Sequence, residues 1–517
     1  MTSRILGLVR DQVLAFYFGT GDAMDAYRLG FKIPNLFRDL FAEGAMSAAF
    51  VPTFTRHVAD AGKPAGWTLG NHVINALMLV TGALVLLGVL FATPLVTALA
   101  GDYALETLPD GTNKLSLTIT LARIMLPTLT LIAVAAAVMG MLNSLRHFFI
   151  PALSPAMFNV VTIVVAVALI PAAPMLGIRQ PIVLIAIATV LGGVAQLALQ
   201  WPTLRREGYR YRPALDWRDP GLQRVLMLMG PGTIGLAATQ LNIVVNAFLA
   251  AREGTGAVSS LDYAFRIMYL PIGLFGVSIA TAVLPAVSRH VVEKDTPASR
   301  KAIADGLSLM MMMNIPATVG LMVLSVPIVR VIFEHGEFNP ESTAGTAAAL
   351  RLYAIGLVAY SIVRIASPTF YALGKNRIPV IVSMCTVVVN ATLNIMLVRV
   401  MGFTGLALGT SIAATFNAVV LLVLLRRSLG GLHERRILSS LVRIAAASAA
   451  MGAAAVATDA WAAGALPGDG IGWQIVRVAL SIGVAIAVLA AAASVLRVRE
   501  FNEGMALVMR RFRRTPR

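Results

Sequence analysis

One stretch decides how this chain folds: Asp25-Ala-Tyr-Arg28-Leu-Gly-Phe-Lys32-Ile-Pro34-Asn-Leu-Phe-Arg38-Asp39-Leu-Phe-Ala-Glu43-Gly-Ala-Met-Ser-Ala-Ala-Phe-Val-Pro52. Its length and apolar content are those of a helix that crosses a membrane. It nevertheless carries three cations and three anions, which a bilayer core tolerates only where they face a hydrated interior. This conflict marks the stretch as functional.

The whole chain has the composition of a protein that lies in lipid. Its 517 residues are 58% hydrophobic and 13% charged, and the mean hydropathy is +0.79, which predicts a polytopic membrane protein. The 42 Lys and Arg against 25 Asp and Glu give a net charge of +17. Most basic residues fall in short loops between apolar runs, as the positive-inside rule requires of cytoplasmic loops. We therefore expect no nucleic acid partner.

No cofactor is expected. The one cysteine, Cys385, excludes a disulfide within the chain, and the six histidines form no H-x-x-x-H pair for a metal. The sequence also lacks the G-x-x-x-x-G-K-[ST] motif that cradles ATP phosphates. We therefore expect a non-enzymatic protein, whose transport would be driven by the membrane potential or an ion gradient.

Apolar segments long enough to cross a hydrocarbon core of about 30 Å recur along the chain. They predict an all-α membrane protein with fourteen spans. These are 1–19, 23–54, 69–99, 115–143, 149–171, 181–203, 222–250, 258–288, 302–333, 344–372, 377–399, 403–425, 437–460 and 472–496.

Alternate connections between the spans differ in charge. By the positive-inside rule the basic set is cytoplasmic, so both termini are predicted to be cytoplasmic, as an even number of spans requires. The basic connections carry Arg56, Lys63, Arg146, Arg205, Arg206, Arg289, Lys294, Lys375, Arg377, Arg426 and Arg427, and the acidic connections carry Asp22, Asp102, Glu106, Asp110, Glu334, Glu337, Glu341, Asp459 and Asp469.

The first span begins close to the first residue. Arg4 follows Met1 by only three residues, so we expect the true start to lie upstream. The alternative is a short first helix whose Arg4 side chain reaches the interface. No small-residue cleavage site ends this run, so the span is expected to be retained.

A repeated motif predicts two lobes. Pro52-x-x-Thr55-Arg56-His57-Val58 closes the second span, and Pro285-x-x-Ser288-Arg289-His290-Val291 closes the eighth, which runs in the same direction. Duplication explains this match. We predict two pseudo-symmetric six-helix lobes, over 1–220 and 221–428, and a third part over 429–517 with the last two spans and a basic tail. The linker 204–220, rich in Arg and Tyr, is expected to lie against anionic headgroups.

The charges of the second span share one helical stripe, formed by Asp25, Arg28, Lys32, Asp39 and Glu43. Each cation near the bilayer centre costs about 2.5 to 3.5 kcal/mol on insertion scales, so these groups should face water. Internal ion pairs are one reading, and an anionic ligand is the other, because clustered arginines suit phosphate oxygens. Further charges in the spans are Arg4, Arg10, Asp11, Arg38 and Arg266.

Two weaker features lie elsewhere. Asn390 and Asn394 are one helical turn apart, and Asn246 lies in the seventh span. Their amide oxygens make them weak candidates for a sodium site, although hydrogen bonding between helices is the commoner role. The last two spans are rich in Ala, and we expect them to form a packing appendix or an apolar groove for a lipid tail.

Several motifs form a recognisable set. They are Ser3-Arg4-Ile-Leu-Gly-Leu-Val-Arg10-Asp11, Asp25-Ala26, Phe31-Lys32-Ile-Pro34-Asn35-Leu-Phe-Arg38, Phe41-Ala-Glu43-Gly44-Ala-Met-Ser-Ala-Ala-Phe50-Val-Pro52, Tyr263-Ala264-x-Arg266, Pro271-x-Gly273-x-x-Gly276-Val and Pro368-x-Phe370-Tyr371-Ala. The set closely resembles the MurJ (MviN) family of lipid II flippases, within the superfamily of multidrug, oligosaccharidyl-lipid and polysaccharide exporters.

The resemblance implies a bacterial inner-membrane protein with fourteen helices, whose two lobes rock about a cationic cavity. Its substrate would be the undecaprenyl-diphosphate-linked disaccharide pentapeptide of cell-wall synthesis, moved from the cytoplasmic to the periplasmic leaflet. Other expected partners are membrane lipid and proteins of cell-wall synthesis. The last two helices would hold the polyprenyl tail. By motif position the cavity residues are Arg4, Arg10, Asp25, Arg38 and Arg266, with Lys32 beside them and Asp11, Arg28, Asp39 and Glu43 as further cavity or ion-pair members.

This chain departs from the family at two places. Some relatives bind sodium through carboxylates where this chain has Asn246 and Asn394. Arg28 replaces the family's usual apolar residue, and we expect it to pair with Asp25 or Glu43. Two other functions stay open: another lipid-linked oligosaccharide flippase or drug antiporter of the superfamily, and a non-transporting scaffold of the cell-wall machinery. A drug antiporter should present acidic or aromatic pocket residues in place of the arginines.

Overall fold

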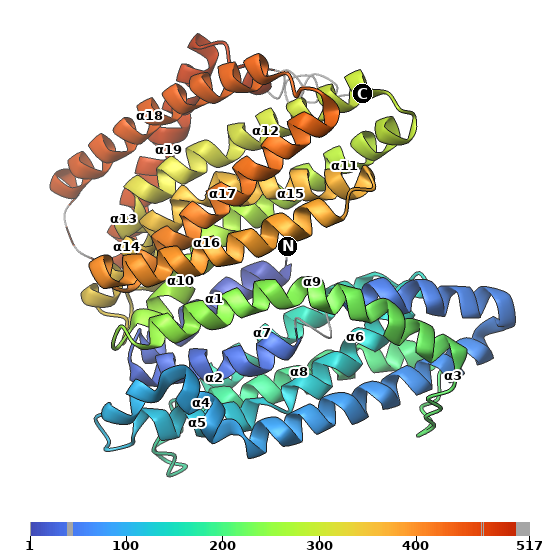
Figure 1. Cartoon of the computed structure of the whole chain (residues 1–517). Coiled ribbons are helices and arrows are strands. Elements are labelled where there is room, and N and C mark those ends of the chain that lie inside the picture. Colours follow the sequence, from blue (N-terminus) through green and yellow to red (C-terminus); the bar gives the residue numbers. More distant parts are fainter. Residues whose placement is uncertain (1, 39–44, 467, 469, 503–517) are drawn as a thin grey trace, which may run out of the picture. The chain divides into compact units, whose positions relative to one another are not determined.

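The computed structural model describes residues 2–38, 45–466, 468 and 470–502 (Figure 1). Within these residues the regular elements are helices, together with one isolated bridge between Thr107 and Asn113. The all-α prediction is confirmed. The elements are α1 (Thr2–Phe18), α2 (Asp22–Arg38), α3 (Ala45–Leu90), α4 (Ala92–Ala100), the 3-10 helix η2 (Gly101–Leu105), α5 (Lys114–Met125), α6 (Thr128–Ser144), α7 (Phe149–Leu169), α8 (Ile182–Arg206), α9 (Pro220–Ala251), α10 (Ala257–Pro271), the π-helix η3 (Ile272–Gly276), α11 (Val277–Val292), α12 (Thr296–Val323), α13 (Ser325–Phe333), α14 (Pro340–Ile355), α15 (Leu357–Ala372), α16 (Arg377–Met401), α17 (Phe403–Leu429), α18 (Glu434–Ala465) and α19 (Ile471–Val495).

Ten of the described helices are long and apolar enough to cross a membrane, or eleven if the bent pair α14 and α15 is one span. The predicted spans without a counterpart in this set are 1–19, 23–54 and 222–250. Helices α1 and α2 are only 17 residues long, and α2 carries several charges. In α9, the side chains of 230–239 and 241 lie outside the described part. The count of fourteen stays a prediction.

The second and third predicted spans meet at a tight turn. Helix α3 covers both the end of the second span and the third span, and Gly62 breaks it with a φ of 79° and a ψ of 175°. This left-handed φ is one that glycine adopts without steric cost, and Pro64 then restarts the helix. The connection predicted over 55–68 is therefore mostly helical.

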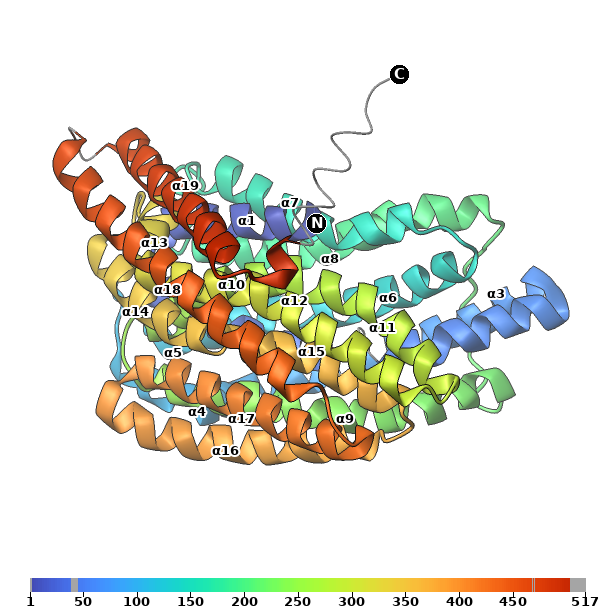
Figure 2. The ribbon, with the colours of Figure 1, turned by 90° about the horizontal axis from the view of Figure 1, so that it is seen from above.

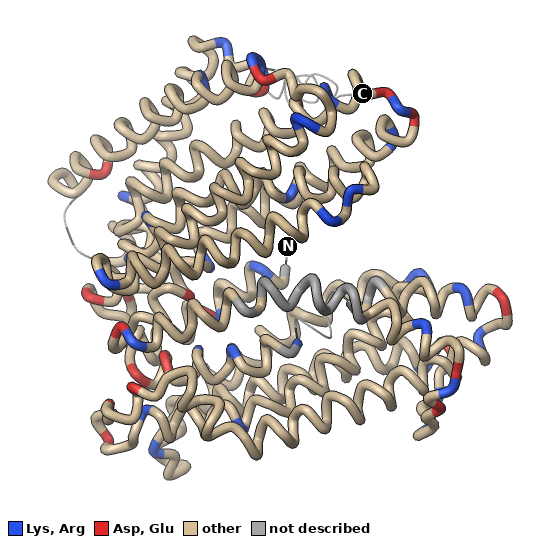
Figure 3. Tube along the Cα trace, in the orientation of Figure 1, with Lys and Arg blue, Asp and Glu red and all other residues tan. Residues whose placement is uncertain are grey.

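The chain forms two compact units, Met1–Ser259 with His335–Asn339, and Ser260–Glu334 with Pro340–Arg517. Helix α9 belongs to the first unit and most of α10 to the second. This division by packing differs from the division by sequence repeat, and the lobes 1–220 and 221–428 stay a prediction. In both units Lys, Arg, Asp and Glu lie mostly near the ends of the helices (Figure 3).

Side-chain hydrogen bonds hold the linker between α8 and α9 against α3. The Tyr209 hydroxyl donates to Asn71 Oδ1 at 2.7 Å, and Asn75 Nδ2 donates to the Arg212 carbonyl at 2.9 Å. Tyr209 is buried at 1% exposure, so its ring packs in the core of the first unit and not among headgroups. For this residue the expectation of a headgroup contact was wrong, because two asparagines of α3 satisfy the polar groups of the linker.

Connections of the predicted basic set meet at one end of the first unit. Glu207 accepts hydrogen bonds from Lys63 Nζ and His147 Nε2, each at 2.8 Å, so three separate connections share one carboxylate. These two bonds, that of Lys63 first, hold the pKa of the Glu207 carboxyl below its ordinary value. Loops expected on the same side of the membrane therefore do contact one another.

The core of the second unit lies among α11, α12, α15 and α17, and α16 packs along α17 (Figure 2). Helices α18 and α19 form a hairpin against α12. The hairpin is joined by a bidentate ion pair, in which Arg477 Nε and Nη2 donate to the two Asp459 oxygens at 2.6 and 2.8 Å. Each of these membrane charges is thereby neutralised by the other.

Candidate functional site

Two arginines surround one aspartate on α1 and α2. The Asp11 carboxylate accepts a hydrogen bond from Arg10 Nη2 at 2.8 Å and another from Arg28 Nη2 at 3.2 Å. All three side chains are at least nine-tenths buried. The Arg10 guanidinium also lies 5.7 Å from the centre of the Phe158 ring on α7. We call Arg10, Asp11 and Arg28 the arginine cluster.

One partner of Arg28 was not expected from the sequence. Arg28 takes Asp11, seventeen residues earlier on another helix, and not Asp25. Glu43, the other expected partner, lies outside the described residues. Helical spacing relates side chains on one helix only, so it could not indicate a partner on α1. The formal charges of the three residues sum to one positive charge, because arginine stays protonated in proteins.

The other predicted cavity residues lie at different places. Arg4 is exposed on α1, while Lys32 and Arg38 are half-buried on α2, which remains helical through Pro34. Arg266 is half-buried on α10, in the second unit. Asp39 and Glu43 lie outside the described residues. The structure thus joins Arg10, Asp11 and Arg28, and the role of the remaining residues in a cavity stays a prediction.

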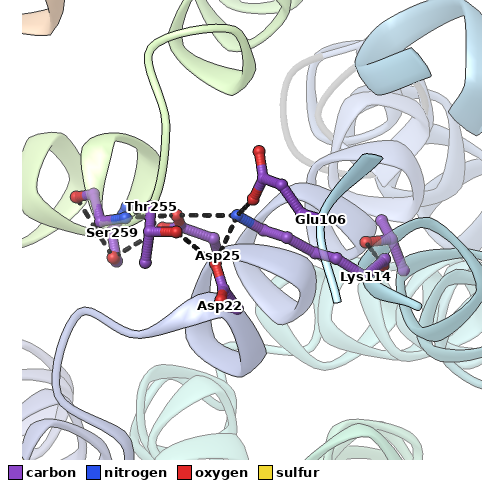
Figure 4. A network of polar contacts seen from close by, with 8 residues as sticks. Asp22, Asp25, Glu106, Lys114, Thr255 and Ser259 are labelled. Carbon is purple, nitrogen blue, oxygen red and sulfur yellow. Dashed lines mark hydrogen bonds and ion pairs between the residues drawn. The ribbon is translucent and has the colours of Figure 1, made fainter. Parts of the chain in front are cut away.

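Asp25 is fully buried and caps the start of α10. Its carboxylate accepts the backbone N–H of Gly256 at 2.7 Å, the backbone N–H of Ser259 at 2.9 Å and the Ser259 hydroxyl at 2.7 Å (Figure 4). Backbone N–H groups at the start of a helix have no partner within the helix, and they favour an anion. Asp25 supplies that anion from α2.

A buried lysine completes this arrangement (Figure 4). Lys114 Nζ lies 2.7 Å from Asp22 Oδ1, 2.5 Å from Glu106 Oε2 and 3.7 Å from Asp25 Oδ2. Its side chain is 0% exposed, and its ammonium group lies 4.0 Å from the centre of the Tyr103 ring. Three carboxylates therefore share one cation. We call the residues of this network the acidic latch: Asp22, Asp25, Glu106, Lys114, Thr255 and Ser259, where the Thr255 hydroxyl donates to Asp22 Oδ1 at 2.6 Å.

Sequence reasoning missed Lys114, because it lies one residue before the predicted span 115–143. The sequence did set Lys114 apart, because it is a cation in a connection that otherwise carries the anions Asp102, Glu106 and Asp110. Connections of the acidic set again meet one another, as connections of the basic set do.

A glycine allows the turn before α10 to approach α2. Gly256 has a φ of +86°, and a Cβ built on it would lie 3.1 Å from the Thr20 carbonyl oxygen. A side chain at this position would be both strained and crowded. The Asp25 hydrogen bond to the Gly256 N–H depends on this close approach.

The asparagines of α16 form hydrogen bonds within the second unit. Asn394 Nδ2 donates to Asn390 Oδ1 at 2.9 Å, and Asn390 Nδ2 donates to Thr410 Oγ1 on α17 at 3.3 Å. A Cβ on Gly409 would come against Asn394 Oδ1, so α17 approaches this amide closely. The expected hydrogen bonding between helices is confirmed for Asn390. Asn246 lies in the first unit, and a sodium site stays a prediction.

Comparisons with known proteins agree on one family. The model of the family described as lipid II flippase MurJ matches residues 14–467. The probable lipid II flippase MurJ of Vibrio cholerae is 35% identical over 424 residues, which cover 81% of this chain and 80% of that protein. The lipid II flippase MurJ of Burkholderia cenocepacia is 32% identical over 431 residues, 83% of this chain and 82% of its own length.

Solved structures extend this agreement to the fold. A lipid II flippase MurJ in an inward closed conformation is 28% identical and superposes with a TM-score of 0.77, covering 96% of this chain and 97% of that chain. An inward-facing multidrug resistance transporter of the MATE family is 17% identical with a TM-score of 0.69, covering 84% and 96%, and shares the fold. This chain is a multi-pass membrane protein and belongs to the lipid II flippase MurJ family.

Proposed function

We propose that this protein moves lipid II, the diphosphate-linked precursor of peptidoglycan, from the inner to the outer leaflet of the bacterial inner membrane. The observation that carries the proposal is the arginine cluster, a buried pair of guanidinium groups around one carboxylate in a chain of the MurJ family. Both termini would lie in the cytoplasm, because the basic connections favour that side.

The cluster suits a diphosphate. Arginine presents several N–H donors in a planar fork, and such forks bind phosphate oxygens in pairs. Asp11 orients Arg10 and Arg28 while leaving one net positive charge among the three residues. The sugar and peptide of the substrate would occupy the hydrated interior, and Arg4, Lys32, Arg38 and Arg266 would line the same path.

The acidic latch would control access from the periplasmic side. It ties α2 to the turn before α10 through Asp25 and Ser259, so this turn can leave α2 only after those bonds break. Breaking and remaking the latch would then alternate the side from which the substrate path is open. The movement needs no covalent step, so we infer a transporter without enzymatic activity.

The energy would come from the membrane potential or an ion gradient. One charge moved through 100 mV gains about 2.3 kcal/mol, enough to return a cationic empty carrier toward a negative cytoplasm. The polyprenyl tail would stay in lipid or in the apolar groove of α18 and α19, which is lined by Ala457, Thr458, Trp461, Leu480 and Val484.

A depletion experiment tests the proposal. Bacterial cells whose own MurJ is depleted should grow when they make this chain, and should accumulate the lipid-linked precursor and lyse when they make Arg10→Ala at equal abundance. Arg205→Ala, an exposed arginine of the basic linker, is the control and should support growth. Normal growth with Arg10→Ala would contradict the cationic path, and failure of the unaltered chain to support growth would contradict the function.

A further inference from the structure

A stripe of polar and aromatic residues runs along α15 in the second unit. Tyr360, Arg364, Ser367 and Tyr371 follow one another at spacings of four, three and four, which places them on one side of the helix. Ile365, on another side, is buried at 4% exposure. Arg364 and Tyr371 are exposed, so the stripe is not part of the packed core.

Arg364 lies near the middle of α15, which with α14 is apolar and long enough to cross a membrane. Its Nη2 donates to the Tyr269 hydroxyl at 2.5 Å. No carboxylate in the described part of the chain forms an ion pair with it, whereas Arg477 is neutralised by both oxygens of Asp459. An exposed, uncompensated arginine within a span is stable where it meets water or an anion and not lipid tails.

The partner of Arg364 is held by a set of aromatic rings. Tyr269 stacks on Phe265 one turn earlier on α10, with ring centres 5.8 Å apart. Phe265 in turn contacts Tyr353 on α14 at 5.5 Å and Tyr360 on α15 at 6.4 Å. Three helices therefore fix the hydroxyl that orients Arg364, and a site on rigid helices holds its groups precisely enough for binding.

The same region carries a predicted cavity residue. Arg266 precedes Tyr269 by three residues, so the two side chains are neighbours on the surface of α10. The π-helix η3 follows directly, at Ile272–Gly276, and single π-turns occur frequently at functional sites.

We propose that Arg364, oriented by Tyr269, is an oxyanion-binding residue of the transport path. Tyr269 engages one of its five N–H donors and leaves part of the planar fork for a ligand. The ligand group is a phosphate or carboxylate oxygen of the lipid-linked substrate, so this inference rests on the proposed function. Two sources have that chemistry: the diphosphate and the carboxylates of the peptide.

Binding to the purified full chain in nanodiscs tests the inference. The dissociation constant is measured for undecaprenyl diphosphate and for the intact disaccharide-pentapeptide precursor. Arg364→Gln should raise it at least about tenfold, as expected for the loss of a hydrogen bond to a charged group. A rise for both lipids assigns the diphosphate to Arg364, and a rise for the precursor alone assigns the peptide carboxylates.

Further variants separate binding from structure. Arg364→Lys keeps the charge but loses the fork, and should raise the constant less than Arg364→Gln. Tyr269→Phe keeps Arg364 but removes its orienting bond, and should also weaken binding. Added salt should weaken binding less in Arg364→Gln than in the unaltered chain, because one charge contact is missing. If Arg364 were only structural, Arg364→Gln would lower the unfolding temperature but would not change the salt dependence of binding.

Arg123→Gln is the matched control. Arg123 is also an exposed arginine in an apolar helix, and its Nη2 donates to the Thr93 hydroxyl at 3.2 Å. Its loss should leave both dissociation constants unchanged. The role of Arg364 would be overturned if Arg123→Gln weakened lipid binding as much as Arg364→Gln does, or if Arg364→Gln bound both lipids as tightly as the unaltered chain. Either result would leave the proposed function intact. Absence of binding by the unaltered chain would overturn both.

Discussion

Arg28 Nη2 donates to Asp11 Oδ1 at 3.2 Å, and this bond joins α2 to α1 inside the first unit. It turns two charged helices into one buried cluster with Arg10. Removing one partner of a buried ion pair leaves a charge without compensation, which is costlier than never having had the pair. The consequences of this bond can therefore be measured one residue at a time.

Asp11→Asn should destabilise the protein more than Arg28→Gln does. Loss of the carboxylate removes the acceptor that two buried guanidinium groups share, at a cost of about 3 kcal/mol or more. Loss of Arg28 leaves Asp11 still bonded to Arg10, and should cost about 1 to 2 kcal/mol. Unfolding in detergent, followed by Trp fluorescence, gives both values. An Asp11→Asn protein as stable as Arg28→Gln would contradict the arrangement.

Lys114→Met should open the acidic latch. Asp22, Asp25 and Glu106 would then repel one another without their shared cation. A cysteine at Ser260, which is buried at 3% exposure beside the latch, reports the opening in a protein whose Cys385 is replaced by Ala. Labelling by a maleimide should quicken by about tenfold, or ~1.4 kcal/mol. Lys114→Arg keeps the cation and should label slowly. If the cysteine were labelled at the same rate in Lys114→Met as with Lys114 in place, Lys114 would not hold the latch closed.

The Gly256 turn offers a comparison between two glycines of equal φ. Gly254 and Gly256 both have a φ of +86°, but nothing lies within 4 Å of a Cβ at Gly254. Gly254→Ala should cost only the left-handed strain, about 1 to 2 kcal/mol. Gly256→Ala should cost more, because its Cβ also crowds the Thr20 carbonyl, and should quicken labelling of the Ser260 cysteine. Identical behaviour of the two variants would show that the close approach is unimportant.

Stability near one end of the first unit should depend on pH through Glu207. Its pKa is held below the ordinary value of 4.5, chiefly by Lys63, so the folded state favours the carboxylate. The resulting stabilisation is full above pH about 4.5 and is lost as the pH falls through the folded-state value. The difference in unfolding temperature between the unaltered chain and Glu207→Gln should shrink between pH 6 and pH 3. A difference that stays constant over this range would contradict the assignment.

The sequence predicted features that depend on one segment at a time. Apolar length indicated the helices, and the charges within the span from Asp25 pointed to α2, which contributes Arg28 to the arginine cluster and Asp22 and Asp25 to the acidic latch. Partners on other helices could not be predicted, because spacing carries no information about packing between helices. The bond between Arg28 and Asp11, and the contact of the Asp25 carboxylate with the start of α10, were therefore not predicted.

Single charges at the edge of a span or inside it were missed for another reason. Lys114 lies just outside a predicted apolar window, and Arg364 lies inside one whose mean hydropathy hides a single charge. Reading each charge against the sign of its connection, or against its apolar neighbours, would have found both. The tight turn at Gly62 could not be predicted, because Pro and Gly indicate that a loop is present but not how long it is.

The most direct test of this account is a structure of the full chain with the intact lipid-linked precursor bound. We expect diphosphate oxygens within about 3 Å of the Arg10 guanidinium, a hydrogen-bond distance, with Asp11 still holding Arg10 and Arg28. A bound precursor whose diphosphate contacts none of Arg10, Arg28, Arg38 or Arg266 would contradict the claim that these cations form its path.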